Sequence, residues 1–187
     1  MKNITILVSG SGTNLQRIID CIKADEIQNA KINLVVADRE CFGLERAAKH
    51  QIDNVLIPRG KDFSDELDKL VPKDTDLIVL AGFLSILKSD FCQKWDKKMI
   101  NIHPSLLPKF GGKGMWGHHV HQAVVEAKEK ESGATVHYVT SGVDEGDIIL
   151  QGKVTLEENE TAESLAQKIH LVESEIFPKA INNVLNP

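Results

Sequence analysis

The residues best suited to chemistry lie in the segment 101–108, which reads Asn-Ile-His-Pro-Ser-Leu-Leu-Pro. Asn101 and His103 stand two positions apart at the end of an expected strand, and alternate side chains of a strand point the same way. An amide can stabilise the oxyanion that develops in acyl transfer, while an imidazole moves the proton that an attacking amine loses. The pair favours acyl transfer, and the alternative is a histidine satisfied by a hydrogen bond in the core.

A second candidate site is the turn Gly10-Ser11-Gly12-Thr13-Asn14, which separates an expected strand from an expected helix. Free backbone N–H groups and the helix dipole favour an anion there. The turn lacks the third glycine of a dinucleotide fingerprint, because Leu15 stands in its place, and it lacks the lysine of a Walker loop. Asp38, at the end of the next strand, leaves open a nucleotide-binding module without chemistry. A tight turn with a capped helix is the plain alternative.

Carboxylates stand in the glycine-flanked loop 141–146, where Asp144 and Glu145 lie side by side. A carboxylate close to His103 would favour the charged form of its ring and fix its tautomer. A solvated turn aspartate is the alternative. Glu173 directly follows Val172, which belongs to the buried stripe of the last expected helix. It is therefore either solvated or placed at the border of a cleft.

Three histidines cluster at positions 118, 119 and 121. Their spacing has neither a partner cysteine nor the HExxH pattern of a zinc site, so no metal is assigned to them. Surface or helix-start positions account for such a cluster.

The elements that position these residues alternate between strand and helix in the first half of the chain. Apolar and β-branched runs predict strands at 4–9, 32–37, 54–57, 76–81 and 99–102. Apolar residues at helical spacing predict helices at 15–22, 44–48 and 64–71. This alternation predicts a parallel sheet covered on both faces. In such sheets ligands bind outside the carboxyl ends of the strands, close to the point where the strand order reverses.

The second half of the chain has a different pattern. A stretch rich in proline and glycine, 104–117, precedes an expected helix at 119–130 and two expected strands at 134–139 and 148–156. A last helix opens near Thr161, a candidate N-cap, and Pro178 bends or ends it. The predicted fold is an α/β, doubly wound, mostly parallel sheet of the Rossmann-like type, with a C-terminal hairpin and helix, in one domain spanning 1–187.

Composition and charge limit the classes of partner. The 187 residues carry a net charge of −5, and 42% of them are hydrophobic, as in ordinary soluble domains. The acidic balance argues against a nucleic-acid partner but allows a small phosphorylated ligand. No apolar run is long enough to span a bilayer, and the N-terminus lacks a signal-peptide cleavage pattern. The three scattered cysteines, Cys21, Cys41 and Cys92, fit reduced thiols, so we expect a cytoplasmic protein without a membrane partner.

Taken together, the motifs resemble the folate-dependent glycinamide ribonucleotide formyltransferases of purine biosynthesis. The resemblance covers essentially the whole chain and is carried by Ser9–Asn14, Ala81-Gly82-Phe83, the segment 101–110 and the late loop that ends in Asp144. Methionyl-tRNA formyltransferases and, in altered form, formyltetrahydrofolate deformylases share the 101–108 motif. Both carry an additional domain for which we expect no room in 187 residues. The glycine turn also favours the purine enzymes over the tRNA enzymes.

The resemblance implies three groups of site residues. The catalytic group is Asn101, His103 and Asp144. The group that binds the ribonucleotide, with its phosphate on the glycine turn, is Gly12, Thr13, Asn14 and Glu173. The group that binds the folate, largely through backbone atoms around the pterin, is Leu84, Ser85, Ile86, Leu87 and Asn101.

The resemblance also implies the reaction. The amine of glycinamide ribonucleotide attacks the formyl carbon of 10-formyltetrahydrofolate, through a tetrahedral intermediate and without a metal. Small molecules are the expected partners of a monomer or a homodimer. Two features depart from the family: Ser85 stands where relatives often have arginine, and the segment 111–117 is unusually long and glycine-rich. That segment is either a mobile flap or a surface loop. An amino-sugar nucleotide is the alternative acceptor.

Overall fold

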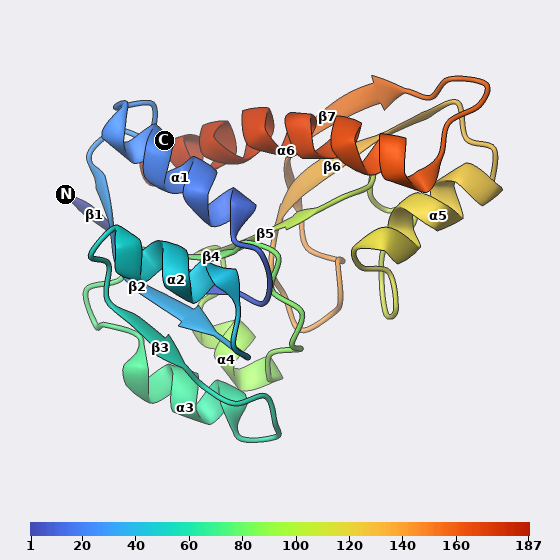
Figure 1. Ribbon diagram of the computed structural model, residues 1–187. Coiled ribbons are helices and arrows are strands. Elements are labelled where there is room, and N and C mark those ends of the chain that lie inside the picture. The colour runs from blue at the N-terminus through green and yellow to red at the C-terminus, as the bar shows by residue number, and fades with distance from the viewer.

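The computed structural model describes all 187 residues and holds one seven-stranded sheet in the order β3-β2-β1-β4-β5-β6-β7 (Figure 1). The parallel strands are β1 (Lys2–Val8), β2 (Ala30–Ala37), β3 (Asn54–Leu56), β4 (Leu77–Leu80) and β5 (Met99–His103). The antiparallel strands are β6 (Glu131–Tyr138), which pairs with β5, and β7 (Ile148–Thr155), which pairs with β6. The predicted fold class, a mostly parallel α/β sheet with a C-terminal hairpin and helix, is confirmed.

Helices cover both faces of the sheet. They are α1 (Thr13–Lys23), α2 (Phe42–Lys49), α3 (Phe63–Leu70), α4 (Ser89–Lys94), α5 (His118–Glu126) and α6 (Ala162–Leu185). The core beneath α1, α2, α5 and α6 contains Ile6 and Val79, whereas the core beneath α3 and α4 contains Leu7 and Ile78. Neighbouring residues of one strand thus enter opposite cores, which explains why the central strands are continuous apolar runs. None of the helices has both the length and the apolar character needed to cross a membrane.

The strand order reverses at β1, because β2 lies on one side of it and β4 on the other. Chain segments that leave the carboxyl ends of β1 and β4 therefore part in different directions and leave a crevice between them. The loops after β1, β4 and β5 begin at this edge of the sheet. The fold in this way brings the glycine turn, the segment 81–87 and the segment after His103 together.

Apart from shifts of one or two residues at element ends, the structure differs from the prediction at one short helix and at the junction between α5 and β6. The short helix α4 was not predicted, because six residues are too few to show helical periodicity. Helix α5 ends at Glu126 rather than at residue 130, and β6 begins at Glu131 rather than at 134. The physical reason is Lys128, whose φ of 54° lies in the left-handed region that stops a helix.

Helix α6 opens as predicted but does not end at Pro178. The Thr161 hydroxyl accepts a hydrogen bond from the Ser164 N–H at 3.1 Å, which confirms the predicted N-cap. Pro178 has no N–H to give to the carbonyl of Ser174, one turn earlier. That carbonyl accepts instead from Nε of Arg17 on α1, at 3.0 Å. The replacement donor explains how the helix continues to Leu185.

A comparison of two residues on α6 tests how this helix is held. Ile169 is 1% exposed and packs in the core, whereas Leu171 is 71% exposed. We expect Ile169→Ala to lower the free energy of unfolding by about 2–5 kcal/mol, because it leaves a cavity. The control Leu171→Ala should change it by less than about 0.5 kcal/mol. Urea denaturation of both variants measures the difference, and equal losses would contradict the packing described here.

Candidate active site

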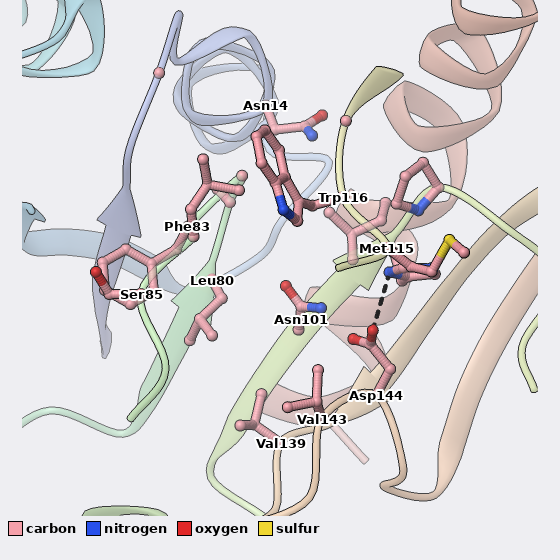
Figure 2. A pocket seen from close by; sticks show the side chains of 18 of the residues that line it. Asn14, Leu80, Phe83, Ser85, Asn101, Met115, Trp116, Val139, Val143 and Asp144 are labelled. Carbon is pink, nitrogen blue, oxygen red and sulfur yellow. Dashed lines mark ion pairs between the residues drawn. The ribbon is translucent and has the colours of Figure 1, made fainter. Parts of the chain in front are cut away.

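A cavity of about 950 Å³ opens at the carboxyl ends of β1, β4 and β5. Figure 2 shows its lining, with Asn101 on β5 and Asp144 on the loop after β6 facing the same space. The lining includes every site residue that the resemblance implies: Gly12, Thr13, Asn14, Leu84, Ser85, Ile86, Leu87, Asn101, His103, Asp144 and Glu173. Residues separated by up to 161 positions are thus collected around one space.

Asn101 is held by a histidine that the sequence motifs do not single out. His137 lies directly opposite Asn101 in the antiparallel pair of β5 and β6, and its Nε2 is 3.1 Å from the Asn101 Nδ2. Nδ1 of His137 donates to the Tyr138 carbonyl at 2.9 Å, which leaves Nε2 as the acceptor for the Asn101 amide. One N–H of Asn101 remains for a ligand. The available signal was a histidine within the mostly apolar run 134–139 that predicts a strand.

His103 is buried, with 4% of its surface exposed, and both ring nitrogens have partners. Its Nε2 donates to the Phe110 carbonyl at 2.8 Å, and its Nδ1 lies 3.4 Å from Oδ2 of Asp144. Burial lowers the pKa of the His103 imidazole below its ordinary value, although the charge of Asp144 and the Phe110 carbonyl act in the opposite direction. The carboxylate therefore favours the charged ring, as expected, but burial outweighs it. Nδ1 of the neutral ring is the nitrogen able to take a proton.

Asp144 connects three parts of the site. Its φ of 58° is left-handed, a conformation that aspartate tolerates better than most residues. The Gly112 N–H donates to Oδ2 at 3.0 Å, and Nε2 of His137 lies 3.5 Å from Oδ1. Burial alone would raise the pKa of the Asp144 carboxyl, but His137, the charge of His103 and the Gly112 N–H together hold this pKa below its ordinary value. The carboxylate is thus a stable negative charge inside the cavity.

The glycine turn forms one end of the cavity. Gly12 has a φ of 69°, and a Cβ there would lie 2.7 Å from the Gly43 Cα, so only glycine fits. Helix α1 begins at the next residue, and its first N–H groups face the turn. Nδ2 of Asn14 donates to Oε2 of Glu173 at 3.3 Å. Glu173 therefore borders the cavity and is not a solvated residue of the helix surface.

The segment 84–87 forms the opposite end, which is apolar. The Leu84 N–H donates to the Ser9 hydroxyl at 2.9 Å, so the segment is fixed to the end of β1. Leu84 and Ile86 remain partly exposed, and Val139 and Val143 line the same cavity. Figure 2 shows these two valines below Asn101 in the view, across the cavity from Asn14. Apolar side chains beside free backbone groups suit a flat heterocycle.

Asp38, which the sequence left open as a ligand for a nucleotide ribose, is instead bonded to Ser85 and to two arginines. The Ser85 hydroxyl donates to Oδ2 of Asp38 at 2.6 Å, and Arg59 donates to the same oxygen at 3.0 Å. Arg39 binds the other oxygen at 3.0 Å. Asp38 is buried, has both oxygens engaged and does not line the cavity, so it is not presented to a nucleotide ribose. The observation that favoured a nucleotide-binding module is thereby removed.

The histidine cluster divides between two surroundings. His118 and His121 line the cavity, whereas His119 packs edge-on against Trp116 of the segment 111–117, with ring centroids 5.0 Å apart. No three His, Cys, Asp or Glu side chains come together in an arrangement that would hold a metal ion. The absence of a metal from the reaction stays a prediction.

Comparison with known protein families identifies one that this sequence matches. Residues 2–181 match the family model described as formyl transferase. The chain belongs to the formyl transferase family. The resemblance inferred from the motifs is confirmed, as is the prediction that the chain is an enzyme of this class.

Individual relatives agree with the family. The phosphoribosylglycinamide formyltransferase of Haemophilus influenzae is 40% identical over 97% of this chain and 86% of its own. The crystal structure of glycinamide ribonucleotide transformylase 1 from Symbiobacterium toebii has a TM-score of 0.89 and 36% identity, covering 97% of this chain and 86% of that one. Both relatives are thus similar to this chain in sequence over nearly its whole length, and the second also has the same fold.

Larger relatives contain the same domain. The trifunctional purine biosynthetic protein adenosine-3 of Drosophila pseudoobscura pseudoobscura is 44% identical over 96% of this chain. The chain spans 13–14% of the length of three such trifunctional relatives. The similarity to these proteins therefore covers only one segment of each of them.

The contact between Asp144 and His103 predicts a measurable shift in titration. Asp144→Asn removes the charge that favours the imidazolium, so we expect the pKa of His103 to fall further. The pKa of His170, which Glu173 raises above its ordinary value, should stay unchanged and serves as the internal control. A pH titration of the histidine ring signals by NMR measures both. An unchanged or higher pKa for His103 would contradict the contact.

Proposed function

We propose that this formyl transferase moves the formyl group of 10-formyltetrahydrofolate to the amine of glycinamide ribonucleotide, in the biosynthesis of purines, and that residues 1–187 act as one catalytic domain. The observation that carries the proposal is the single cavity with an anion-favouring turn at one end, an apolar wall at the other and Asn101, His103 and Asp144 along it. The names of the bacterial relatives support the same acceptor.

The acceptor binds by its phosphate at the glycine turn. The N–H groups of Gly12, Thr13 and Asn14 meet the phosphate oxygens, and the positive end of the α1 dipole favours their charge. The Glu173 carboxylate, which only accepts hydrogen bonds, pairs with sugar hydroxyls. This orientation directs the amine of the acceptor away from the turn, toward His103.

The folate binds at the apolar end. Its pterin ring lies between the segment 84–87 and the valines at 139 and 143, and exchanges hydrogen bonds with backbone groups. A volume of about 950 Å³ is at the upper end of the range for ligand pockets and suits two ligands held side by side. The formyl group then projects toward Asn101, in the middle of the cavity.

The reaction follows from these positions. The unprotonated amine attacks the formyl carbon, and the carbonyl electron pair moves to oxygen. The free N–H of Asn101 stabilises that oxyanion. Nδ1 of His103 takes the proton that the amine loses, and the negative charge of Asp144 stabilises the imidazolium that results. The imidazolium returns the proton to the folate nitrogen as the bond from carbon to that nitrogen breaks. The products are the formylated amine and tetrahydrofolate.

An assay with two acceptors tests the proposal. Purified protein is mixed with 10-formyltetrahydrofolate and either glycinamide ribonucleotide or an amino-sugar nucleotide, and the loss of the formyl group from the folate is followed. We expect turnover with glycinamide ribonucleotide alone. Turnover with the amino-sugar nucleotide alone would change the acceptor, and tight binding of NAD without any formyl transfer would overturn the proposed chemistry.

Three substitutions test the catalytic roles. Asn101→Ala should lower kcat about 10²–10³-fold, because one oxyanion donor is lost. His103→Ala and Asp144→Asn should abolish measurable turnover, because the proton acceptor or its charge partner is missing. Calorimetry should show that all three variants still bind glycinamide ribonucleotide.

Glu145→Gln is the matched control, because this neighbour of Asp144 does not line the cavity that holds His103. Its turnover should match that of the unmodified chain. Normal activity in either the His103 or the Asp144 variant would reject the roles assigned to those residues.

A further inference from the structure

His121 is a buried histidine with an unsatisfied ring nitrogen. It lies in helix α5, is 7% exposed and lines the cavity. Its Nδ1 is buried and has no hydrogen-bond partner. A buried polar atom without a partner destabilises the fold, and a bound ligand that pairs with it removes that cost. The His121 ring forms no hydrogen bond where α5 packs against α6. A purely structural role therefore does not explain why a polar Nδ1 is buried there.

The groups around His121 define what it can bind. Burial lowers the pKa of its imidazole below the ordinary value; Glu173 on α6 acts against this, while His118 on the same helix and His103 on β5 add to it. The ring is therefore neutral at pH 7 and offers one hydrogen-bond donor and one acceptor. Glu173 carries a negative charge and only accepts.

These properties select one part of an acceptor molecule. Glu173, whose charge acts on the His121 ring, only accepts hydrogen bonds and therefore favours ligand groups that donate them. Hydroxyl and amide groups can donate to Glu173 and can either donate to His121 or accept from it. Ala166 of α6 also lines the cavity and has a small side chain. The chemistry therefore matches a neutral polyhydroxyl or amide segment.

We propose that His121 binds the sugar and amide portion of the acceptor, between a phosphate at the glycine turn and an amine at His103. This inference rests on the proposed function. It adds a residue that determines which acceptor fits and how its amine is directed. The residue comes from the helix that follows the glycine-rich segment 111–117.

Steady-state kinetics of His121 variants test the inference. His121→Phe keeps the size of a ring and removes both nitrogens. We expect the KM for glycinamide ribonucleotide to rise about tenfold, the KM for 10-formyltetrahydrofolate to stay within twofold, and kcat to fall less than the ratio kcat/KM. His121→Asn retains a polar atom near the position of Nδ1, and His121→Gln one near that of Nε2. Whichever of these two variants restores the KM identifies the ring nitrogen of His121 that binds the acceptor.

Gln122→Ala is the matched control, because Gln122 is exposed on the same helix, pairs with Glu126 and does not line the cavity. Thermal unfolding establishes that each variant is folded. If His121→Phe does not fold, the ring nitrogen shifts of His121 in the unmodified protein are compared by NMR with and without glycinamide ribonucleotide, and a shift is expected. Turnover by the unmodified chain with an unchanged KM in the folded His121→Phe variant, or unchanged ring shifts, would overturn this inference. Absence of turnover by the unmodified chain would instead overturn the proposed function.

Discussion

The site depends on one buried charge, the carboxylate of Asp144. Its oxygens face His103 on β5, His137 on β6 and the N–H of Gly112, so one group fixes two strands and the glycine-rich segment relative to each other. A negative charge in a largely buried place is costly unless donors surround it. The Gly112 N–H donates a hydrogen bond to Oδ2, and Nδ1 of His103 beside the same oxygen becomes a second donor when the ring takes a proton. Structural stability and chemistry are therefore linked at Asp144.

The sheet provides the frame for this charge. Because the strand order reverses at β1, the loops after β1, β4 and β5 meet at one edge. The antiparallel strand β6 then adds residues that a purely parallel sheet would place elsewhere. Its register sets His137 opposite Asn101 and leads the chain into the loop that carries Asp144. Helix α6 crosses from this hairpin to α1 and brings Glu173 to Asn14 (Figure 1). The two ends of the chain thus build one cavity.

Much of this arrangement is local in the sequence and could be predicted. The apolar runs of β1 and β4, the glycine turn and the alternation of Asn101 and His103 depend on residues close in the chain. Contacts between distant residues could not be predicted. The engagement of Asp38 by Arg59 and Ser85, the pairing of His137 with Asn101 and the hydrogen bond from Arg17 to the Ser174 carbonyl all depend on register and helix packing. The end of α5 at Glu126, just before Lys128, follows from a backbone angle at Lys128 that the residue type does not indicate. Whether burial or the charge of Asp144 dominates the pKa of His103 likewise depends on how deeply the ring is buried, which the sequence does not show.

The central claim is that the formyl group passes directly from a donor at the apolar end to an amine near His103. Carbon NMR with a donor labelled with ¹³C in its formyl group tests it most directly, in a single turnover with glycinamide ribonucleotide and protein in excess over the donor. We expect the label to move from the folate signal to the formamide signal of the acceptor, with no signal of free formate. Label that collects in formate while the acceptor stays unformylated would contradict it.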